Sequence, residues 1–213
     1  MVSSNIEFKN FSQKKNNPKV KKILNELLTN YFNKNDELLL SLSKKYKYRF
    51  KFKNIEKYKK FKHYRIFGMG GSSLGAEAVY SFLKKKITKN FSFVNNIDLS
   101  HDQDNKINQF NIIISKSGNT LETLTNLNYR KVKKNCLFIT ESRKSYLRTL
   151  ALKLRSEIIE HNNFIGGRYS VLSETGMIPA FFMGLKPNNF KRLDNLISSK
   201  RFISTLTYNV SSI

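Results

Sequence analysis

The chain of 213 residues has one cysteine, three prolines and no tryptophan. Because a disulfide needs two cysteines, Cys136 can form none within the chain, and the apolar residues 136–140 around it predict a buried strand. No apolar run approaches the roughly 20 residues of a membrane-spanning helix. The first residues also lack the basic and apolar segments of a secretion signal. We therefore expect a cytoplasmic protein with no membrane partner.

Acidic residues are scarce as well, with 15 against 39 basic residues and a formal net charge of +24. A charge of this size can indicate nucleic-acid binding. The lysines are spread along the chain instead of forming a known basic motif, so we expect no nucleic-acid partner. The positive field is still expected to raise the local concentration of a small anionic substrate.

Glycine is absent from the first 67 residues, and all nine glycines lie between Gly68 and Gly184. In the glycine-free part, apolar residues at helical spacing predict a helix at residues 18–32, and Asp36 is expected to cap a second helix. Residues 46–62 are rich in lysine and aromatic residues. They fit an irregular arm or a short strand pair. RNA binding by stacking of bases on these aromatic rings is an alternative that no motif supports. We expect residues 1–62 to form an N-terminal helical extension.

From residue 64 onward, short apolar runs alternate with helical patterns. The predicted strands are residues 64–67, 91–94, 110–114, 137–139 and 157–160. The predicted helices are residues 74–86, 120–134, 144–155 and 174–185. This alternation predicts an α/β fold with a doubly wound, mainly parallel five-stranded sheet. We expect this domain to span residues 63–187, with its ligand beyond the carboxyl ends of the strands.

The last part of the chain has two predicted elements. A helix is expected at about residues 187–198, and residues 201–213 have the pattern of a strand that has just begun. We therefore expect residues 188–213 to be a linker helix and the start of a second domain, in a chain that is truncated.

Three polar or glycine-rich loops follow predicted strands. The first is GMGGSSLG at residues 68–75, where glycines let the backbone approach a ligand closely. It lacks the G-x-G-x-x-G spacing of a dinucleotide site because position 73 is serine, although Asp98 could still act as a ribose-binding acid. The pattern G-x-x-x-x-G-K-[ST] is absent, which excludes a P-loop.

The second loop is SKSGNT at residues 115–120, between a buried strand and a helix. Its hydroxyls and backbone N–H groups at a helix N-terminus suit a phosphate or another small anion, with Lys116 as an added cation. The same residues also suit an ordinary capped turn. The third loop is GGRYS at residues 166–170, where Arg168 can bind a phosphate, stabilise an enediolate oxyanion, or be a surface arginine.

Together these loops resemble the first sugar-isomerase (SIS) domain of the glucose-6-phosphate isomerase family. The residues that carry the resemblance are 68–75, 93–98 with His101, 115–123 and 166–170. The serine–lysine–serine loop is shared by sugar-phosphate SIS domains, whereas GGRYS points to the isomerase family itself. The resemblance implies an SIS-type sheet at residues 63–187 and the start of a second SIS domain near the end of the chain.

By this resemblance the protein interconverts glucose 6-phosphate and fructose 6-phosphate through a cis-enediolate, without a metal or a cofactor. The implied phosphate-binding residues are Ser115, Ser117 and Thr120, with Lys116 beside them. The resemblance also implies that Gly71 and Ser72 line the sugar end and that Arg168 is the catalytic residue that stabilises the enediolate. The full-length protein is expected to be a homodimer, and the small-molecule partner is a sugar phosphate.

The catalytic base of the family is a glutamate of the second SIS domain, and no motif for it is present here. Nothing in the sequence selects Glu122, Glu141 or Glu174 for that role, and His101 is interpreted as structural. We therefore expect the fragment alone to bind sugar phosphates weakly and not to isomerise them. Two alternatives remain, a non-catalytic sugar-phosphate-binding SIS regulator and another SIS-family sugar-phosphate isomerase.

Overall fold

The computed structural model describes residues 17–33, 36–97 and 108–211, so that Asp98 and His101 lie outside the described residues. The chain divides into two compact units. One unit is residues 47–187, and the other joins the chain up to Tyr46 with the chain from Asn188 onward. Each unit has its own packing, and the sheet belongs to the unit of residues 47–187.

Five parallel strands form the sheet in the order β2-β1-β3-β4-β5. Their bounds are β1 His63–Phe67, β2 Asn90–Val94, β3 Gln109–Ile114, β4 Cys136–Thr140 and β5 Glu157–Glu160. Phe67 pairs with Val94 on one side and with Ile113 on the other, which puts β1 between β2 and β3. The predicted α/β fold with a five-stranded parallel sheet is therefore confirmed.

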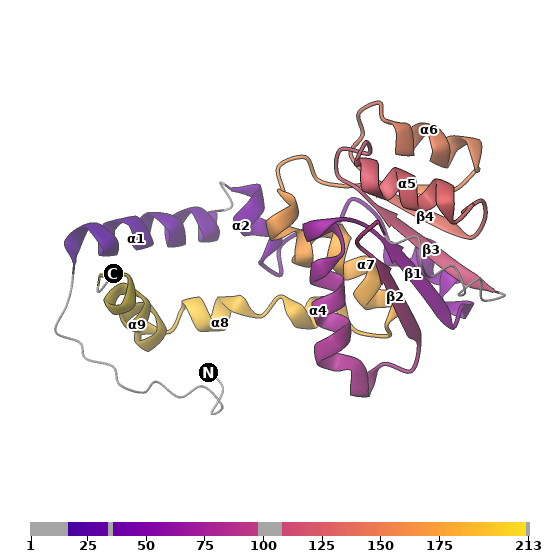
Figure 1. The fold of residues 1–213 in the computed structure, drawn as a ribbon. Helices are drawn as coiled ribbons and strands as arrows, with labels where there is room; N and C mark the ends of the chain where they lie inside the picture. Colours follow the sequence, from indigo (N-terminus) through magenta and orange to yellow (C-terminus); the bar gives the residue numbers. More distant parts are fainter. Residues whose placement is uncertain (1–16, 34–35, 98–107, 212–213) are drawn as a thin grey trace. The chain divides into compact units, whose positions relative to one another are not determined.

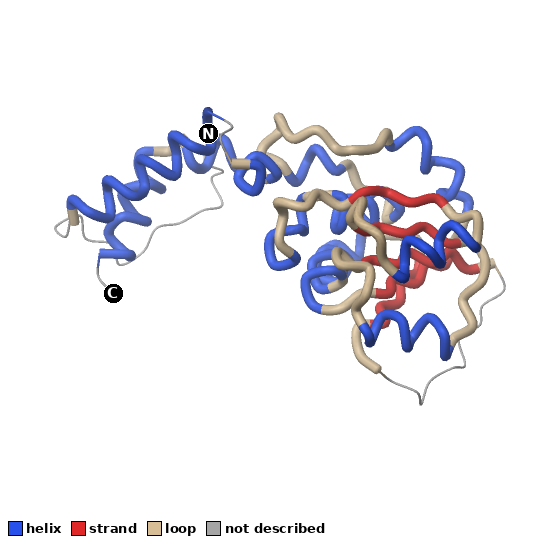
Figure 2. Tube along the Cα trace, turned by 90° about the horizontal axis from the view of Figure 1, so that it is seen from above, coloured by secondary structure: helices blue, strands red, loops and turns tan. Residues whose placement is uncertain are grey.

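Helices cover both faces of this sheet (Figures 1 and 2). One face packs against α4 (Leu74–Leu83) and α7 (Glu174–Phe182), and the other packs against α5 (Leu121–Tyr129) and α6 (Tyr146–Lys153). Side chains of a strand alternate between the two faces, so Ile112 and Ile114 enter the first core and Ile113 enters the second. All three are fully buried, and each contributes about 1.5–3 kcal/mol.

Residues 47–62 belong to the sheet unit and contain short helices, not a pair of strands. The helices are α3 (Phe52–Ile55) and a 3₁₀ helix, η1 (Glu56–Lys60). The ring centroids of Tyr58 and Phe61 lie 4.5 Å and 5.1 Å from that of Phe110. Packing in the core explains these aromatic residues, because their rings cover the sheet.

The other unit is helical. It contains α1 (Pro18–Asn33), α2 (Glu37–Ser41), α8 (Leu193–Ile197) and α9 (Lys200–Ser211), and a 3₁₀ helix, η5 (Pro187–Phe190), crosses its boundary. The predicted helix at residues 18–32 and the Asp36 cap are both confirmed, because the Asp36 carboxylate accepts from Leu38 N at 2.8 Å and Leu39 N at 3.1 Å. Lys191 Nζ donates to Ser41 O at 2.9 Å, and this hydrogen bond connects the N-terminal and C-terminal segments of the unit.

The prediction of a strand within residues 201–213 is wrong, because residues 201–211 belong to the helix α9. Its serine and threonine hydroxyls donate to backbone carbonyls within the helix, as in Thr205 Oγ1 to Arg201 O at 2.8 Å and Thr207 Oγ1 to Ile203 O at 2.8 Å. Ile203, Thr207 and Val210 also follow helical spacing, and α9 packs against α1. Tertiary packing has therefore overridden the strand propensity of these residues.

Candidate functional site

The carboxyl edge of the sheet has a switch point between β1 and β3. The chain leaves β1 through α4 towards β2, and it leaves β3 through α5 towards β4, so the two crossovers run in opposite directions. In open α/β sheets, ligands bind in the crevice that this reversal creates. The loops of residues 68–73 and 115–120 follow these two strands, so the fold brings two of the predicted loops to the expected place.

Hydrogen bonds within the SKSGNT loop give it a fixed shape. The side-chain oxygens of Ser115 and Thr120 lie 2.8 Å apart, and Gly118 N donates to Ser115 Oγ at 3.1 Å. Asn119 N donates to Ser117 Oγ at 3.3 Å. Ser115 is 2% exposed, so its hydroxyl lies beneath the loop surface and holds the turn closed.

Both the backbone conformation at position 118 and the atoms around it require glycine. Its φ of 68° lies in the left-handed region that favours glycine. A Cβ atom there would overlap the Ser145 hydroxyl at the start of α6. Leu147 N donates to Gly118 O at 3.0 Å, and Tyr146 N donates to Asn119 Oδ1 at 2.9 Å. The loop is thus anchored against the first turn of α6.

The first and third predicted loops meet backbone to backbone. Their 3₁₀ helices are η2 (Gly70–Ser72) and η4 (Gly167–Leu172). A Cβ atom at Gly71 would overlap the carbonyl of Gly167. Ser170 Oγ donates to both carbonyls, to Gly71 O at 3.2 Å and to Gly167 O at 2.7 Å. Arg168 follows this contact directly and is exposed.

An open cavity of about 640 Å³ lies at this edge of the sheet. The residues that line it are Ser72, Lys116, Ser117, Thr120, Glu141, Arg143 and Asn163. Four of them, Ser72, Lys116, Ser117 and Thr120, were predicted as site residues from the sequence. Ser115 lies buried at the base of the loop, and neither Gly71 nor Arg168 lines the cavity. The roles assigned to these residues stay predictions.

Three lining residues were not selected from the sequence, and two of them carry charge. The Glu141 carboxylate lies 3.5 Å from Lys116 Nζ through one oxygen and 2.6 Å from Arg143 Nε through the other. Lys116 Nζ also donates to Asn163 O at 2.7 Å. Glu141 and Asn163 follow β4 and β5 closely, and Arg143 follows Glu141 by two residues. Their position after neighbouring strands was the available signal, although no motif marks them.

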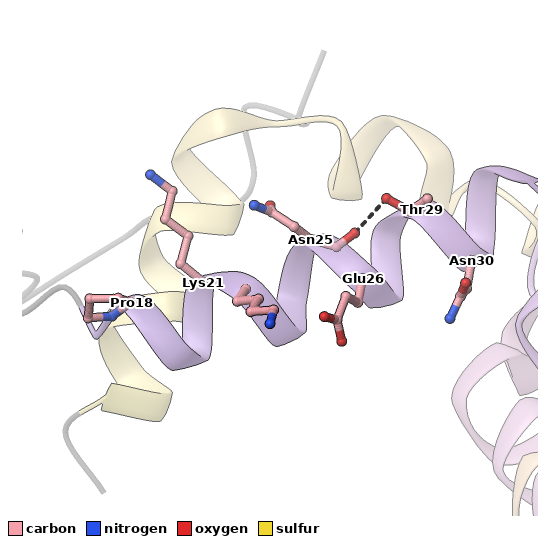
Figure 3. Close-up of a pocket in the computed structure, with 7 residues that line it drawn as sticks. Pro18, Lys21, Asn25, Glu26, Thr29 and Asn30 are labelled. Atoms are coloured by element: carbon pink, nitrogen blue, oxygen red, sulfur yellow. Dashed lines mark hydrogen bonds between the residues drawn. The ribbon is translucent and has the colours of Figure 1, made fainter.

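The described residues contain a second hollow on the helical unit, along α1 (Figure 3). Side chains of this one helix line it, including Lys21, Glu26 and Asn30, and Thr29 Oγ1 donates to Asn25 O at 2.8 Å. Groups from different elements do not converge there, so we do not treat this hollow as a site.

Within residues 17–33, 36–97 and 108–211, no three or more His, Cys, Asp or Glu side chains are grouped so that they could hold a metal ion. Over the same residues, no helix has the length and apolar character needed to cross a membrane.

The sheet topology and the position of the cavity define the class of the protein, a doubly wound α/β domain with a polar cavity at its switch point. A crystal structure of a hypothetical protein from Thermus thermophilus shares the fold, with a TM-score of 0.60 and 20% identity over 88% of this chain and 48% of that one. The model of the family "Phosphoglucose isomerase" matches residues 44–199. The chain therefore belongs to the phosphoglucose isomerase family.

Curated relatives carry the name glucose-6-phosphate isomerase. The protein of Borreliella afzelii is 36% identical over 56% of this chain and 26% of its own length. The protein of Methanocaldococcus jannaschii is 35% identical over 62% of this chain and 36% of its own. That of Aster yellows witches'-broom phytoplasma is 34% identical over 64% and 38%. The matched part of this chain thus corresponds to about a quarter to two fifths of each relative.

Proposed function

We propose that the chain is part of a glucose-6-phosphate isomerase and that it supplies the binding site for the phosphate of the substrate. The observation that carries this proposal is the cavity at the switch point, where Ser72, Lys116, Ser117 and Thr120 converge. Hydroxyl and ammonium groups donate strong hydrogen bonds to phosphate oxygens. Membership of the family supports glucose 6-phosphate and fructose 6-phosphate as the substrate pair.

In the proposed reaction, a proton leaves C2 of the open-chain aldose and returns to C1 through a cis-enediolate. The SKSGNT loop holds the phosphate, which is the unreactive end of the substrate. Arg168 is the proposed enediolate-stabilising residue, since a guanidinium offsets the negative charge that develops on the oxygen. Its exposed position, directly after the contact between Gly71 and Gly167, leaves it accessible to a substrate.

The proposed reaction also needs a base. Glu141 is the carboxylate of the cavity, and its two cationic partners, Lys116 and Arg143, occupy both of its oxygens. We therefore propose that the base comes from outside this chain, that the chain alone does not isomerise sugar phosphates, and that the complete enzyme is a homodimer.

Calorimetry on the 213-residue chain tests this proposal. We expect binding of glucose 6-phosphate, fructose 6-phosphate and 5-phosphoarabinonate, no binding of glucose, and weaker binding of aminosugar phosphates. A coupled assay is expected to detect no turnover. Equal affinity for glucose and glucose 6-phosphate would contradict the phosphate site. Stronger binding of aminosugar phosphates would favour another sugar-phosphate SIS protein, and robust turnover would refute the proposed external base.

A further inference from the structure

Glu141 is the centre of a three-residue charge cluster in the cavity, with Lys116 and Arg143 on its two oxygens. The Glu141 side chain is only 6% exposed, whereas that of Arg143 is 64% exposed. A buried carboxylate is costly unless cations and hydrogen bonds compensate it. The cluster therefore has a buried negative centre covered by two cations, and its formal net charge is positive.

The backbone holds this cluster in place. Glu141 N donates to Lys116 O at 3.1 Å, and Thr140 Oγ1 donates to the same carbonyl at 3.3 Å. Arg148 Nη1 donates to Glu141 O at 3.4 Å. These bonds connect the end of β4 to the SKSGNT loop after β3. As a result, Glu141 keeps a fixed position relative to the predicted phosphate-binding residues.

Within the described part of the chain, the guanidinium of Arg143 is held by one edge only. Its Nε contacts Glu141, which leaves both Nη groups available on the rim of the cavity. An exposed arginine usually samples many conformations. Here the short contact with a buried carboxylate restricts the side chain, so that the available N–H groups are presented where a ligand of the SKSGNT loop would lie.

We propose that Arg143 is a second phosphate-binding cation of this cavity and that Glu141 is the positioning residue that holds it there. A phosphate monoester carries a charge of about −1.5 to −2 at neutral pH. The charge of Lys116 is cancelled by that of the Glu141 carboxylate, so the cluster presents a net positive charge to the phosphate only when Arg143 is included. This inference rests on the phosphate-binding part of the proposed function and adds a residue to it.

Lys144 provides a matched control. It is the neighbour of Arg143 in the chain and carries the same charge, and it is exposed without lining the cavity. The experiment measures the affinity of the whole chain for inorganic phosphate and for glucose 6-phosphate by calorimetry. The variants are Arg143→Met, Arg143→Lys and Lys144→Met. Comparison of the two methionine variants separates a direct contact from the general positive field of the chain.

We expect Arg143→Met to weaken the binding of both ligands about tenfold, because it removes charge-assisted hydrogen bonds. Arg143→Lys should recover part of the loss, and Lys144→Met should change the affinity less than twofold. Similar losses in Arg143→Met and Lys144→Met would overturn the role of Arg143, and so would an unchanged affinity in Arg143→Met.

The role of Glu141 needs a measurement that a merely structural residue would not affect. In a Glu141→Gln background, checked for folding by circular dichroism, we expect Arg143→Met to weaken phosphate binding less than threefold. A full tenfold loss in that background would show that Glu141 does not position Arg143. If Glu141→Gln fails to fold, Glu141→Asp gives the same test, because its shorter side chain withdraws the carboxylate from Nε.

The two proposals fail in different ways. If inorganic phosphate binds and depends on Arg143 while glucose 6-phosphate adds no affinity, the inference stands and the proposed substrate is wrong. If glucose 6-phosphate binds and depends on Thr120 but not on Arg143, the proposed function stands and this inference is wrong. If the unaltered chain binds neither ligand, both are overturned.

Discussion

The side-chain oxygens of Ser115 and Thr120 lie 2.8 Å apart across the SKSGNT loop and share one hydrogen bond. The two residues nevertheless differ in position, because Ser115 is buried and Thr120 lines the cavity. Ser115 Oγ also accepts from Gly118 N at 3.1 Å. The family resemblance implies the same role for both hydroxyls, whereas their surroundings favour loop closure for Ser115 and ligand contact for Thr120.

The first prediction separates these two roles. Ser115→Ala should lower the free energy of unfolding by about 1–3 kcal/mol, because it removes two hydrogen bonds of a buried hydroxyl, one with Thr120 Oγ1 and one from Gly118 N. Thr120→Ala should change the stability less and should weaken the binding of sugar phosphates. Urea unfolding and calorimetry measure the two effects, with the exposed Ser142→Ala as the control. Equal stability of Ser115→Ala and Ser142→Ala would contradict the loop-closing role.

The second prediction concerns the contact between the first and third loops. Gly71→Ala should lower the free energy of unfolding by about 1–3 kcal/mol, because the added Cβ overlaps the Gly167 carbonyl and forces the two backbones apart. Gly166→Ala is the control, since its Cβ would meet only Tyr169 Cδ2, at 3.8 Å. Thermal unfolding compares the two variants. A smaller loss in Gly71→Ala than in Gly166→Ala would show that this contact is not close in solution.

Most of the sheet could be predicted from the sequence because strands such as β3 and β4 contain short apolar runs. Ile112, Ile113 and Ile114 are buried on both faces, which is the pattern that parallel strands covered by helices produce. The helix α9 could not be predicted in the same way. Its β-branched residues favour a strand locally, and the contact with α1 that stabilises the helix joins opposite ends of the chain.

The candidate site was predictable where a motif marks it. Lys116, Ser117 and Thr120 stand in one continuous loop, so their proximity follows from the sequence. Glu141 and Arg143 follow the next strand along the sheet, and the contact of Glu141 with Lys116 depends on β4 being the neighbour of β3. Strand order is a tertiary property, so the charge cluster could be found only in the structure.

The third prediction concerns pH and His161. Burial lowers the pKa of His161 below its ordinary value of 6.5, while the bond to Asn162 O and the charges of Glu174 and Glu141 oppose this, and Lys116 adds to it. A lowered pKa means that the folded state binds fewer protons than the unfolded state near that pH. The stabilising contribution is therefore present above pH 6.5 and is lost as the pH falls below it.

Urea unfolding at about pH 7.5 and about pH 5.5, on either side of the ordinary histidine pKa, measures this dependence. The unaltered chain should lose more stability between the two values than His161→Gln, which has no imidazole to protonate. Equal losses in the two proteins would show that another group is responsible for the effect of pH.

The last prediction uses the single cysteine. Burial raises the pKa of the Cys136 thiol from its ordinary value of 9.0 to about 12. Its Sγ also donates to Lys134 O at 3.1 Å, and the residue is 4% exposed. Because the thiolate is the reactive form, the folded chain should not react with Ellman's reagent at about pH 8, and one thiol should react in urea. Its contribution to stability is present below pH 9.0 and is lost as the pH rises towards about 12. Rapid labelling without denaturant would show that the start of β4 opens readily in solution.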